Sequence, residues 1–227
     1  ICSLLKSSLN TSRRQRKNYV DAVLLMGGNI RGGKDYPKGS FFSLEALEAE
    51  IKSDEVIGVV SMPGRVLAQS IEETHAGDPI PGWMQYDDGI HEEAVDPKEN
   101  DGRPTRVTTV AGEAIHLDRI YRVATKISDL TCGQSPALKD YFAQNPALLP
   151  SKGSYVNIQA ELMAFFGRNL FRKLWEATEL RMPNEQDEPK DGTLCGLEEC
   201  NPEGRLSTLD RDGDGSVTVE DMQIALR

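Results

Sequence analysis

The sequence predicts a domain of the α+β class, because short apolar runs of strand length are interspersed with helical patterns and one segment has the form of a hairpin. Three apolar runs have the length and composition of strands: 22–26, 56–60 and 121–125. Helical patterns lie at three further places: 44–51, 64–75 and 155–180. Segments 91–95 and 105–110 flank a polar stretch with a turn at 100–102 and are expected to pair as a hairpin.

The N-terminal half contains the shorter helical signals. Leu5 and Leu9 fit one face of a first helix. Ser43 is suited to cap the helix at 44–51, because a serine hydroxyl can accept a hydrogen bond from a backbone amide of the first turn. The next helix begins at Gly64 and runs to about His75.

The helical pattern at 155–180 is the longest in the chain and ends before Pro183. Its apolar residues recur at helical spacing: Ile158, Leu162, Phe165, Phe166, Leu170, Leu174 and Trp175. We expect this face to pack against the body of the domain. A groove for a partner helix is the alternative.

The size and charge of the chain suit one large domain with an acidic appendage. The chain has 227 residues and a formal net charge of −10. From Asn184 onward the chain has twelve Asp and Glu residues and four Lys and Arg residues, so the net charge of the tail is −8. The preceding residues have a net charge of −2. This distribution argues against nucleic-acid binding and for a cation-binding tail. No apolar run approaches the roughly 20 residues that span a bilayer.

A glycine-rich turn follows the first predicted strand and is the main candidate binding element. Gly27, Gly28 and Asn29 precede Arg31, and glycines let a ligand approach the backbone closely. A guanidinium on such a turn can bind a carboxylate or phosphate through two hydrogen bonds. A plain turn with a solvated arginine is the alternative.

Four ordered motifs within about residues 1–140 resemble the C-terminal domain of the 5'-nucleotidase family. The first is the strand and Gly-Gly-Asn-Ile-Arg turn, followed by Tyr36-Pro-Lys-Gly39 and a short helix. The others are 59–67 (Val-Val-Ser-Met-Pro-Gly-Arg-Val-Leu), 83–90 (Trp-Met-Gln-Tyr-Asp-Asp-Gly-Ile) and 119–125 (Arg-Ile-Tyr-Arg-Val-Ala-Thr). Their order is more specific than any one of them.

The resemblance implies a layered α/β sandwich that recognises a phosphorylated small-molecule substrate. In that family the catalytic chemistry belongs to a separate N-terminal domain with two divalent metals of the zinc or manganese type. This chain has only His75, His91 and His116, and they do not cluster in the sequence. We therefore interpret the chain as a fragment that is inactive alone and acts with its own N-terminal catalytic domain. The family also favours an extracellular or secretory location.

The resemblance is weaker at the positions that contact the nucleoside. The two base-stacking phenylalanines of the family align with Ser53 and Ser128, and the ribose-binding aspartate aligns with Gln134. Met26 stands where the family has a small polar residue. Because stacking contributes on the order of 1–3 kcal/mol per ring, these differences argue against ordinary nucleoside recognition.

The tail carries a calcium-loop pattern of the EF-hand type. Carboxylates stand at alternating positions, and Gly215 permits the sharp turn. The expected calcium ligands are Asp210, Asp212, Asp214, Ser216, Thr218 and Asp221. Asp221 replaces the usual bidentate glutamate, which lowers the expected calcium affinity and favours magnesium.

The residues between the body and this loop read as an acidic linker. Residues 187–198 contain some ligands of a second loop, but Pro189 replaces one of them. Cys195 and Cys200 could form a disulfide in this segment. The predicted organisation is a substrate-binding domain at 1–183, a linker at 184–204 and an EF-hand at 205–227.

Two functions follow from these patterns. The first is the substrate-recognition domain of a 5'-nucleotidase-type phosphoester hydrolase, with Arg31 binding an anionic group and calcium bound in the tail. The alternative is a non-catalytic calcium-binding protein on a degenerate nucleotidase scaffold, which the substitutions at Ser53 and Ser128 favour.

Overall fold

A computed structural model describes residues 1–11, 19–31, 33, 36–37, 43–179, 218 and 222. The chain divides into two compact units, residues 1–163 and residues 164–227. No helix in the described part of the chain is long and apolar enough to cross a membrane.

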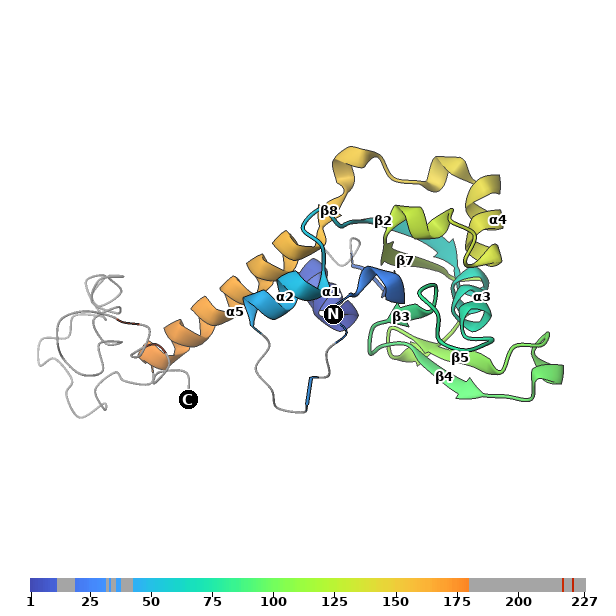
Figure 1. The fold of residues 1–227 in the computed structure, drawn as a ribbon, viewed down its shortest axis with the longest axis horizontal. Helices are drawn as coiled ribbons and strands as arrows, with labels where there is room; N and C mark the ends of the chain where they lie inside the picture. The colour runs from blue at the N-terminus through green and yellow to red at the C-terminus, as the bar shows by residue number, and fades with distance from the viewer. Residues whose placement is uncertain are drawn as a thin grey trace, which may run out of the picture. The chain divides into compact units, whose positions relative to one another are not determined.

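The first unit is built on a mixed five-stranded sheet (Figure 1). The strands follow the order β3 (Met84–Tyr86), β1 (Ala22–Met26), β7 (Ile120–Thr125), β2 (Val56–Pro63) and β8 (Val156–Asn157). β1 runs parallel to β7, and the other neighbouring pairs are antiparallel. All five residues of β1 are buried, as expected for an apolar run in the interior of a sheet. The three apolar runs predicted as strands are therefore confirmed.

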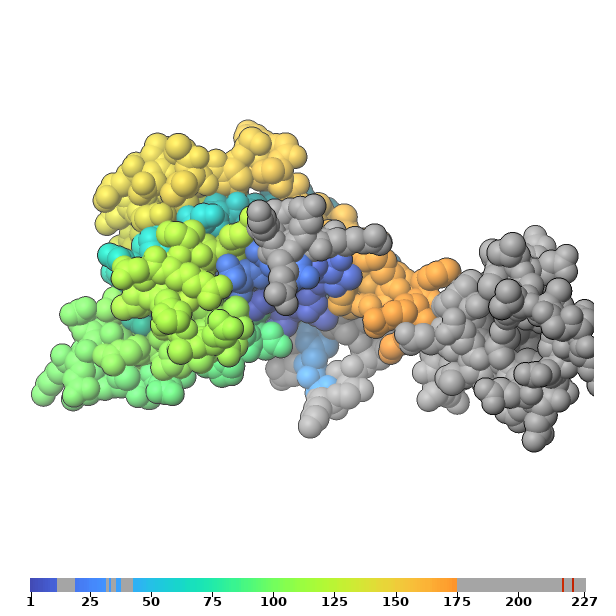
Figure 2. Space-filling model, turned by 180° about the vertical axis from the view of Figure 1, so that it is seen from behind, coloured from blue at the N-terminus to red at the C-terminus, as the bar shows by residue number. Residues whose placement is uncertain are grey.

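A second sheet contains the predicted hairpin. β4 (His91–Ala94) pairs antiparallel with β5 (Thr105–Val110), which pairs with β6 (Glu113–Ala114). The connection from β4 to β5 contains a 3-10 turn, η3 (Pro97–Glu99), and turns back at Asp101 and Gly102, which have φ angles of 52° and 83°. Figure 2 shows this segment in green beside the yellow-green residues that follow it.

Helices cover the sheets of the first unit. α1 (Cys2–Thr11) contacts β1 and β3, and α2 (Leu44–Glu50) is capped by Ser43, whose Oγ accepts a 3.2 Å hydrogen bond from Ala46 N. α3 (Gly64–Thr74) contacts β2, β3 and β5, so it lies between the two sheets. α4 (Pro136–Gln144), which the sequence analysis did not single out, packs on α3. The described residues of this unit also contain the 3-10 turns η2 (Gly27–Asn29), η4 (Ile127–Leu130), η5 (Pro146–Leu148) and η6 (Lys152–Ser154).

The core joins both sheets to α3 and α4. Leu24 and Met62 of the main sheet, Ile71 of α3, Val107 of β5 and Phe142 of α4 belong to one cluster of buried side chains. A continuous core of this kind fixes the hairpin to the main sheet.

The long helix α5 (Ile158–Glu179) begins in the first unit and ends in the second. Ile158 and Leu162 are buried, whereas Leu170 is 47% exposed and Phe171 is 65% exposed. The expected packing against the body is therefore confirmed for the part of the helix that belongs to the first unit.

Candidate functional site

The sheet topology brings three loops to one edge. Because β1 and β7 are parallel, the turn after Met26 and the turn after Thr125 leave the sheet at the same edge. β2 runs antiparallel to β7, so the loop before Val56 also lies there. These loops are the three segments to which the family resemblance assigns substrate recognition. We call this place the sheet edge.

The backbone of the glycine turn is fixed against a neighbouring loop. Gly27 N donates to Trp83 O and Gly28 N donates to Pro81 O, both at 2.8 Å. A Cβ on Gly28 would lie 3.2 Å from Pro81 Cβ, so a side chain there would crowd this loop. The glycines permit close packing of two protein segments, and both amides already have protein acceptors.

Asn29 lies in a buried polar network that ties the three loops together. Its Nδ2 donates to Asp129 Oδ2 at 2.7 Å, and its Oδ1 accepts from Lys126 Nζ at 3.2 Å. Asp129 Oδ2 also accepts from Met26 N at 3.3 Å. Lys126 forms an ion pair with Glu55 at 2.5 Å. Asn29 therefore holds the turn in place, while its own side chain is turned into the protein.

Asp129 anchors this network in a largely enclosed position. Its residue surface is 6% exposed. Burial raises the pKa of Asp129 above its ordinary value, although the Met26 amide, Lys126 and Asn29 act in the opposite direction. Loss of hydration thus outweighs the donors that surround this carboxylate.

Arg31 extends from the anchored turn into solvent. Its backbone amide donates to Glu50 O at 2.9 Å, and its Nε donates to Gly28 O at 3.1 Å. Within the described residues, no hydrogen bond or ion pair engages its two terminal nitrogens. The guanidinium is thus oriented through Nε, and its terminal nitrogens can reach an anion.

An open, largely apolar hollow of about 570 Å³ lies beside the glycine turn. It is lined by Gly27, Gly28, Pro79, Ile80, Pro81, Trp83 and Gln85. The Trp83 ring stacks on the buried His75 ring, with centroids 4.2 Å apart. Arg31 is not among the lining residues and is linked to them through the bond from its Nε to the Gly28 carbonyl.

The residues that the sequence resemblance aligns with nucleoside contacts do not supply aromatic surface. Ser53 and Ser128 are exposed. Gln134 packs against Gly82, where a Cβ would lie 2.5 Å from Gln134 Oε1. The aromatic ring of this site is Trp83, which sequence reasoning did not select. Its signal was a tryptophan between a Gly/Pro-rich loop and a strand.

The three histidines occupy separate places, and only His75 is buried. Its Nδ1 lies 2.8 Å from Glu92 Oε1, and its Nε2 lies 2.9 Å from Met84 O. His91 and His116 are exposed. The described residues contain no group of three or more His, Cys, Asp or Glu side chains that could hold a metal ion.

Most of the predicted tail lies outside the described residues. This applies to Asp210, Asp212, Asp214, Ser216, Asp221, Cys195 and Cys200. Met222 N donates to Thr218 O at 3.2 Å, a spacing of four residues that is typical of an α-helix. Cys2, which is buried, and Cys132, which is exposed, are both unpaired.

Comparison with known proteins gives partial structural likenesses only. No protein-family profile and no curated protein matches the chain. A 5'-nucleotidase precursor from Thermus thermophilus has a TM-score of 0.49 and 16% identity, over 74% of this chain and 32% of that one. An NAD nucleotidase from Haemophilus influenzae has a TM-score of 0.45 and 13% identity, over 74% of this chain and 28% of that one.

The chain thus spans about a third of the length of the nucleotidases that it resembles. With TM-scores below 0.5 and identities of 16% or less, these likenesses do not establish the family of this chain. Its function has to be inferred from its own residues.

Proposed function

We propose that this chain is the substrate-recognition domain of a 5'-nucleotidase-type, metal-dependent phosphoester hydrolase. One observation carries the proposal. The turn before Arg31, the loop at 51–55 and the segment after Thr125 meet at one sheet edge and are joined by the Asn29–Asp129 and Lys126–Glu55 contacts. These are the segments that recognise substrate in the family whose motif order the sequence resembles.

The chemistry of the edge suits an anionic ligand that also has a nonpolar part. The terminal nitrogens of Arg31 can donate two parallel hydrogen bonds to a phosphate or carboxylate group. The hollow beside Gly28 offers Ile80, which is 55% exposed, and Trp83 to a ring or other apolar group. Trp83 would then replace the stacking surface that Ser53 and Ser128 do not provide.

The hydrolysis itself would be performed by a second domain of a longer protein. That domain would hold two zinc- or manganese-type ions, and this chain would position the substrate against them. Calcium in the tail, bound by Asp210, Asp212, Asp214, Ser216, Thr218 and Asp221, would stabilise the C-terminal unit. The bond from Met222 N to Thr218 O has the spacing that the expected exit helix requires.

The test is phosphate release by protein that contains this chain and its upstream domain. The panel comprises nucleoside mono- and diphosphates, sugar phosphates and sugar nucleotides, with manganese or zinc present. Arg31→Gln is expected to lower kcat/KM about tenfold or more, because it removes hydrogen bonds to a charged group. Lys52→Gln removes one exposed positive charge from the same edge and is expected to leave kcat/KM nearly unchanged.

A second candidate is a non-catalytic calcium-binding protein on the same scaffold. The specific observation in its favour is that Ser53 and Ser128 leave both family stacking positions without a ring. Absence of phosphate release by folded, metal-loaded protein would reject the enzyme and favour this candidate.

Calcium binding has its own test. Calcium is expected to raise the melting temperature of the chain, and Asp210→Ala is expected to abolish the rise, because it removes the first ligand of the loop. Lack of a calcium-dependent shift in the wild-type chain would reject the EF-hand assignment.

A further inference from the structure

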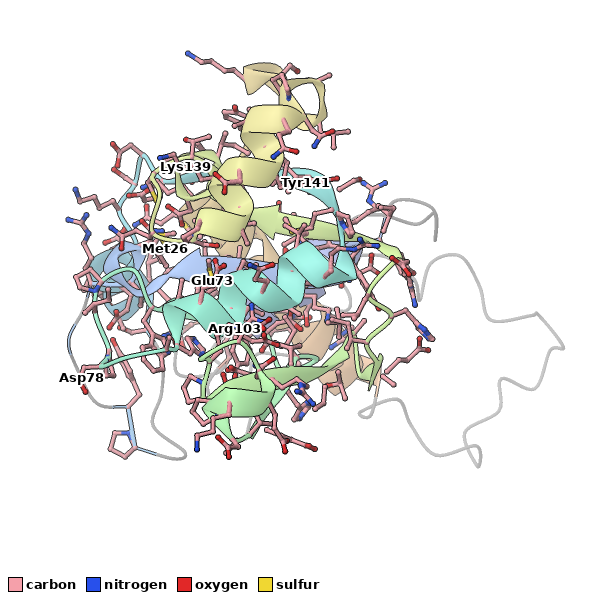
Figure 3. The ribbon with its side chains drawn as sticks, turned by 90° about the vertical axis from the view of Figure 1, so that its right-hand side faces the viewer. Met26, Glu73, Asp78, Arg103, Lys139 and Tyr141 are labelled. Atoms are coloured by element: carbon pink, nitrogen blue, oxygen red, sulfur yellow. The ribbon has the colours of Figure 1, made fainter. Side chains whose placement is uncertain are left out.

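A second hollow lies between α3 and the hairpin, away from the residues of the sheet edge. It measures about 380 Å³ and is lined by Arg65, Ala68, Gln69, Glu72, Asn100, Arg103, Arg106, Val107, Ile115 and Leu117. Figure 3 shows Arg103 beside α3, on the side of the helix that faces the hairpin. The lining shares no residue with the hollow at Gly27 and Gly28.

Arg103 is held rigidly at this hollow. Its side chain is 16% exposed, and its Nε lies 3.3 Å from Glu72 Oε2 and donates to Asn100 O at 3.2 Å. Glu72 is buried and also accepts from Val107 N at 2.9 Å, so its carboxylate joins α3 to β5. A guanidinium fixed in this way loses little conformational entropy when it binds an anion.

Arg65 and Arg106 add two guanidinium groups to the hollow, and each interacts only weakly with other groups of the protein. Arg65 pairs with Asp118, but the two side chains are 63% and 84% exposed, and exposed pairs of this kind contribute little to stability. Arg106 Nη2 donates to the backbone carbonyl of Glu99 at 2.9 Å and has no carboxylate partner among the described residues. A dianion could therefore engage both side chains at small cost.

The charge of the lining contrasts with that of the whole chain. The lining contains three arginines and one glutamate, so its formal net charge is +2, whereas the formal net charge of the whole chain is −10. Asp101 pairs with Arg103 at 3.0 Å from outside the hollow, where its side chain is 91% exposed and screened by solvent. The apolar part of the wall comes from Val107, Ile115 and Leu117.

From this combination we propose that the hollow between α3 and β5 is a second binding site, which takes the phosphate monoester of a small organic molecule. The three guanidiniums bind the phosphoryl oxygens, and the apolar wall contacts the carbon part of the ligand. The site is independent of the function proposed for Arg31 and can regulate or extend it.

Phenyl phosphate is a suitable probe, because it combines a dianionic phosphoryl group with a small apolar ring. Titration of the 15N-labelled 227-residue chain is expected to shift the amide signals of Arg65, Arg106 and Val107. Arg65→Gln combined with Arg106→Gln is expected to weaken binding about tenfold or more. Phenyl sulfate has nearly the same shape but one negative charge, and is expected to bind more weakly.

Two controls make the result specific. Lys98→Gln removes an exposed positive charge from the same hairpin connection, outside the hollow, and is expected to bind phenyl phosphate like the wild type. Arg31→Gln removes the anion contact proposed at the sheet edge, so any shifts at Gly28 are expected to disappear, whereas the shifts at Arg65, Arg106 and Val107 are expected to keep their wild-type affinity. Melting temperatures establish that each variant is folded.

Two outcomes would overturn the proposal. One is unchanged affinity in the folded Arg65→Gln, Arg106→Gln variant. The other is a set of shifts in the wild-type chain that is confined to Gly28, Arg31 and their neighbours. Because the shift map uses the wild-type chain, it decides the question even if the double variant does not fold.

Discussion

Asp129 at the sheet edge and Glu92 on strand β4 of the hairpin are both enclosed carboxylates, but their pKa values move in opposite directions. Burial raises the pKa of Asp129 and is only partly opposed by its neighbours. Burial also acts to raise the pKa of Glu92, yet hydrogen bonds from His75, Thr105 and Tyr86 outweigh it and hold that pKa below its ordinary value. The donors around a buried carboxylate, and not burial alone, decide which protonation state the fold favours.

The two networks also differ in the groups that surround the carboxylate. Both ring nitrogens of His75 lie within hydrogen-bond distance of oxygen atoms, namely Glu92 Oε1 at 2.8 Å and the Met84 carbonyl at 2.9 Å. Two hydroxyl groups complete the shell of Glu92: Tyr86 at 2.7 Å and Thr105 at 2.6 Å. The Glu92 network joins the C-terminal end of α3 to β3, β4 and β5, whereas the Asp129 network joins the three loops of the sheet edge.

The largest expected effect is therefore at His75. His75→Ala is expected to lower the free energy of unfolding by about 3 kcal/mol or more, because it leaves the enclosed Glu92 carboxylate without its imidazole partner and Trp83 without its stacked ring. His91→Ala is the matched control, since His91 is exposed and is expected to change stability by less than about 0.5 kcal/mol. Urea unfolding measures both. Equal losses in the two variants would contradict the special role of His75.

A smaller loss is expected at Asp129. Asp129→Ala removes the acceptor of Asn29 Nδ2 and Met26 N and is expected to cost about 2 kcal/mol, because both donors are left buried. Relief of the desolvated charge offsets part of this cost, so the loss is smaller than at His75. Asp54→Ala, at an exposed position of the same edge, is expected to be nearly neutral in the same unfolding measurement. An Asp129→Ala variant as stable as the wild type would show that other contacts hold the turn.

Removal of a single neutral donor should have a lesser effect still. Tyr86→Phe keeps the ring and removes one hydroxyl from the shell of Glu92, with an expected loss of about 1 kcal/mol. Tyr19→Phe is the control, because Tyr19 is 42% exposed. If thermal unfolding gave the same stability for both variants, the Glu92 network would be held by His75 and Thr105 alone.

The sequence was sufficient for the longer strands, because apolar runs such as 22–26 and the polar turn at 100–102 are local signals. It did not predict the short strands β3, β6 and β8, and it assigned the residues of β8 to the helical pattern at 155–180. It was not sufficient for α4, whose Ser135 cap and spaced Leu138 and Phe142 are equally local but were not selected. For α5, the helical spacing predicted an apolar face, and the burial of Ile158 and Leu162 confirms its packing within the first unit.

At the sheet edge, sequence reasoning selected the glycine turn but did not predict the contacts that its residues make. Gly27, Gly28 and Asn29 were expected to serve a ligand, yet their amides and side chain bond to Trp83, Pro81 and Asp129. These contacts join residues that are 50 to 100 positions apart, and no local pattern encodes such pairs. The Glu92 network is of the same kind, because its four members come from separate elements.

The smallest expected effect concerns the pH dependence of stability at the two carboxylates. The folded-state pKa of Glu92 is lowered, so its contribution is complete above the unfolded-state value and is lost as the pH falls through the folded-state value. The folded-state pKa of Asp129 is raised, so the folded state takes up that proton first and gains stability as the pH falls from the folded-state value toward the unfolded-state one. The two residues therefore contribute slopes of opposite sign under acid conditions.

Two neutral variants separate these slopes. Between about pH 6 and about pH 3.5, Glu92→Gln is expected to lose less stability on acidification than the wild type, and Asp129→Asn is expected to lose more. Urea unfolding at both pH values gives the change in the free energy of unfolding within each variant. The effect of the substitution itself on stability is the same at both pH values and cancels from this change. Equal losses of stability on acidification in the two variants would mean that the pKa values of Glu92 and Asp129 are not shifted in opposite directions. The contrast between the sheet edge and the Glu92 network would then not hold.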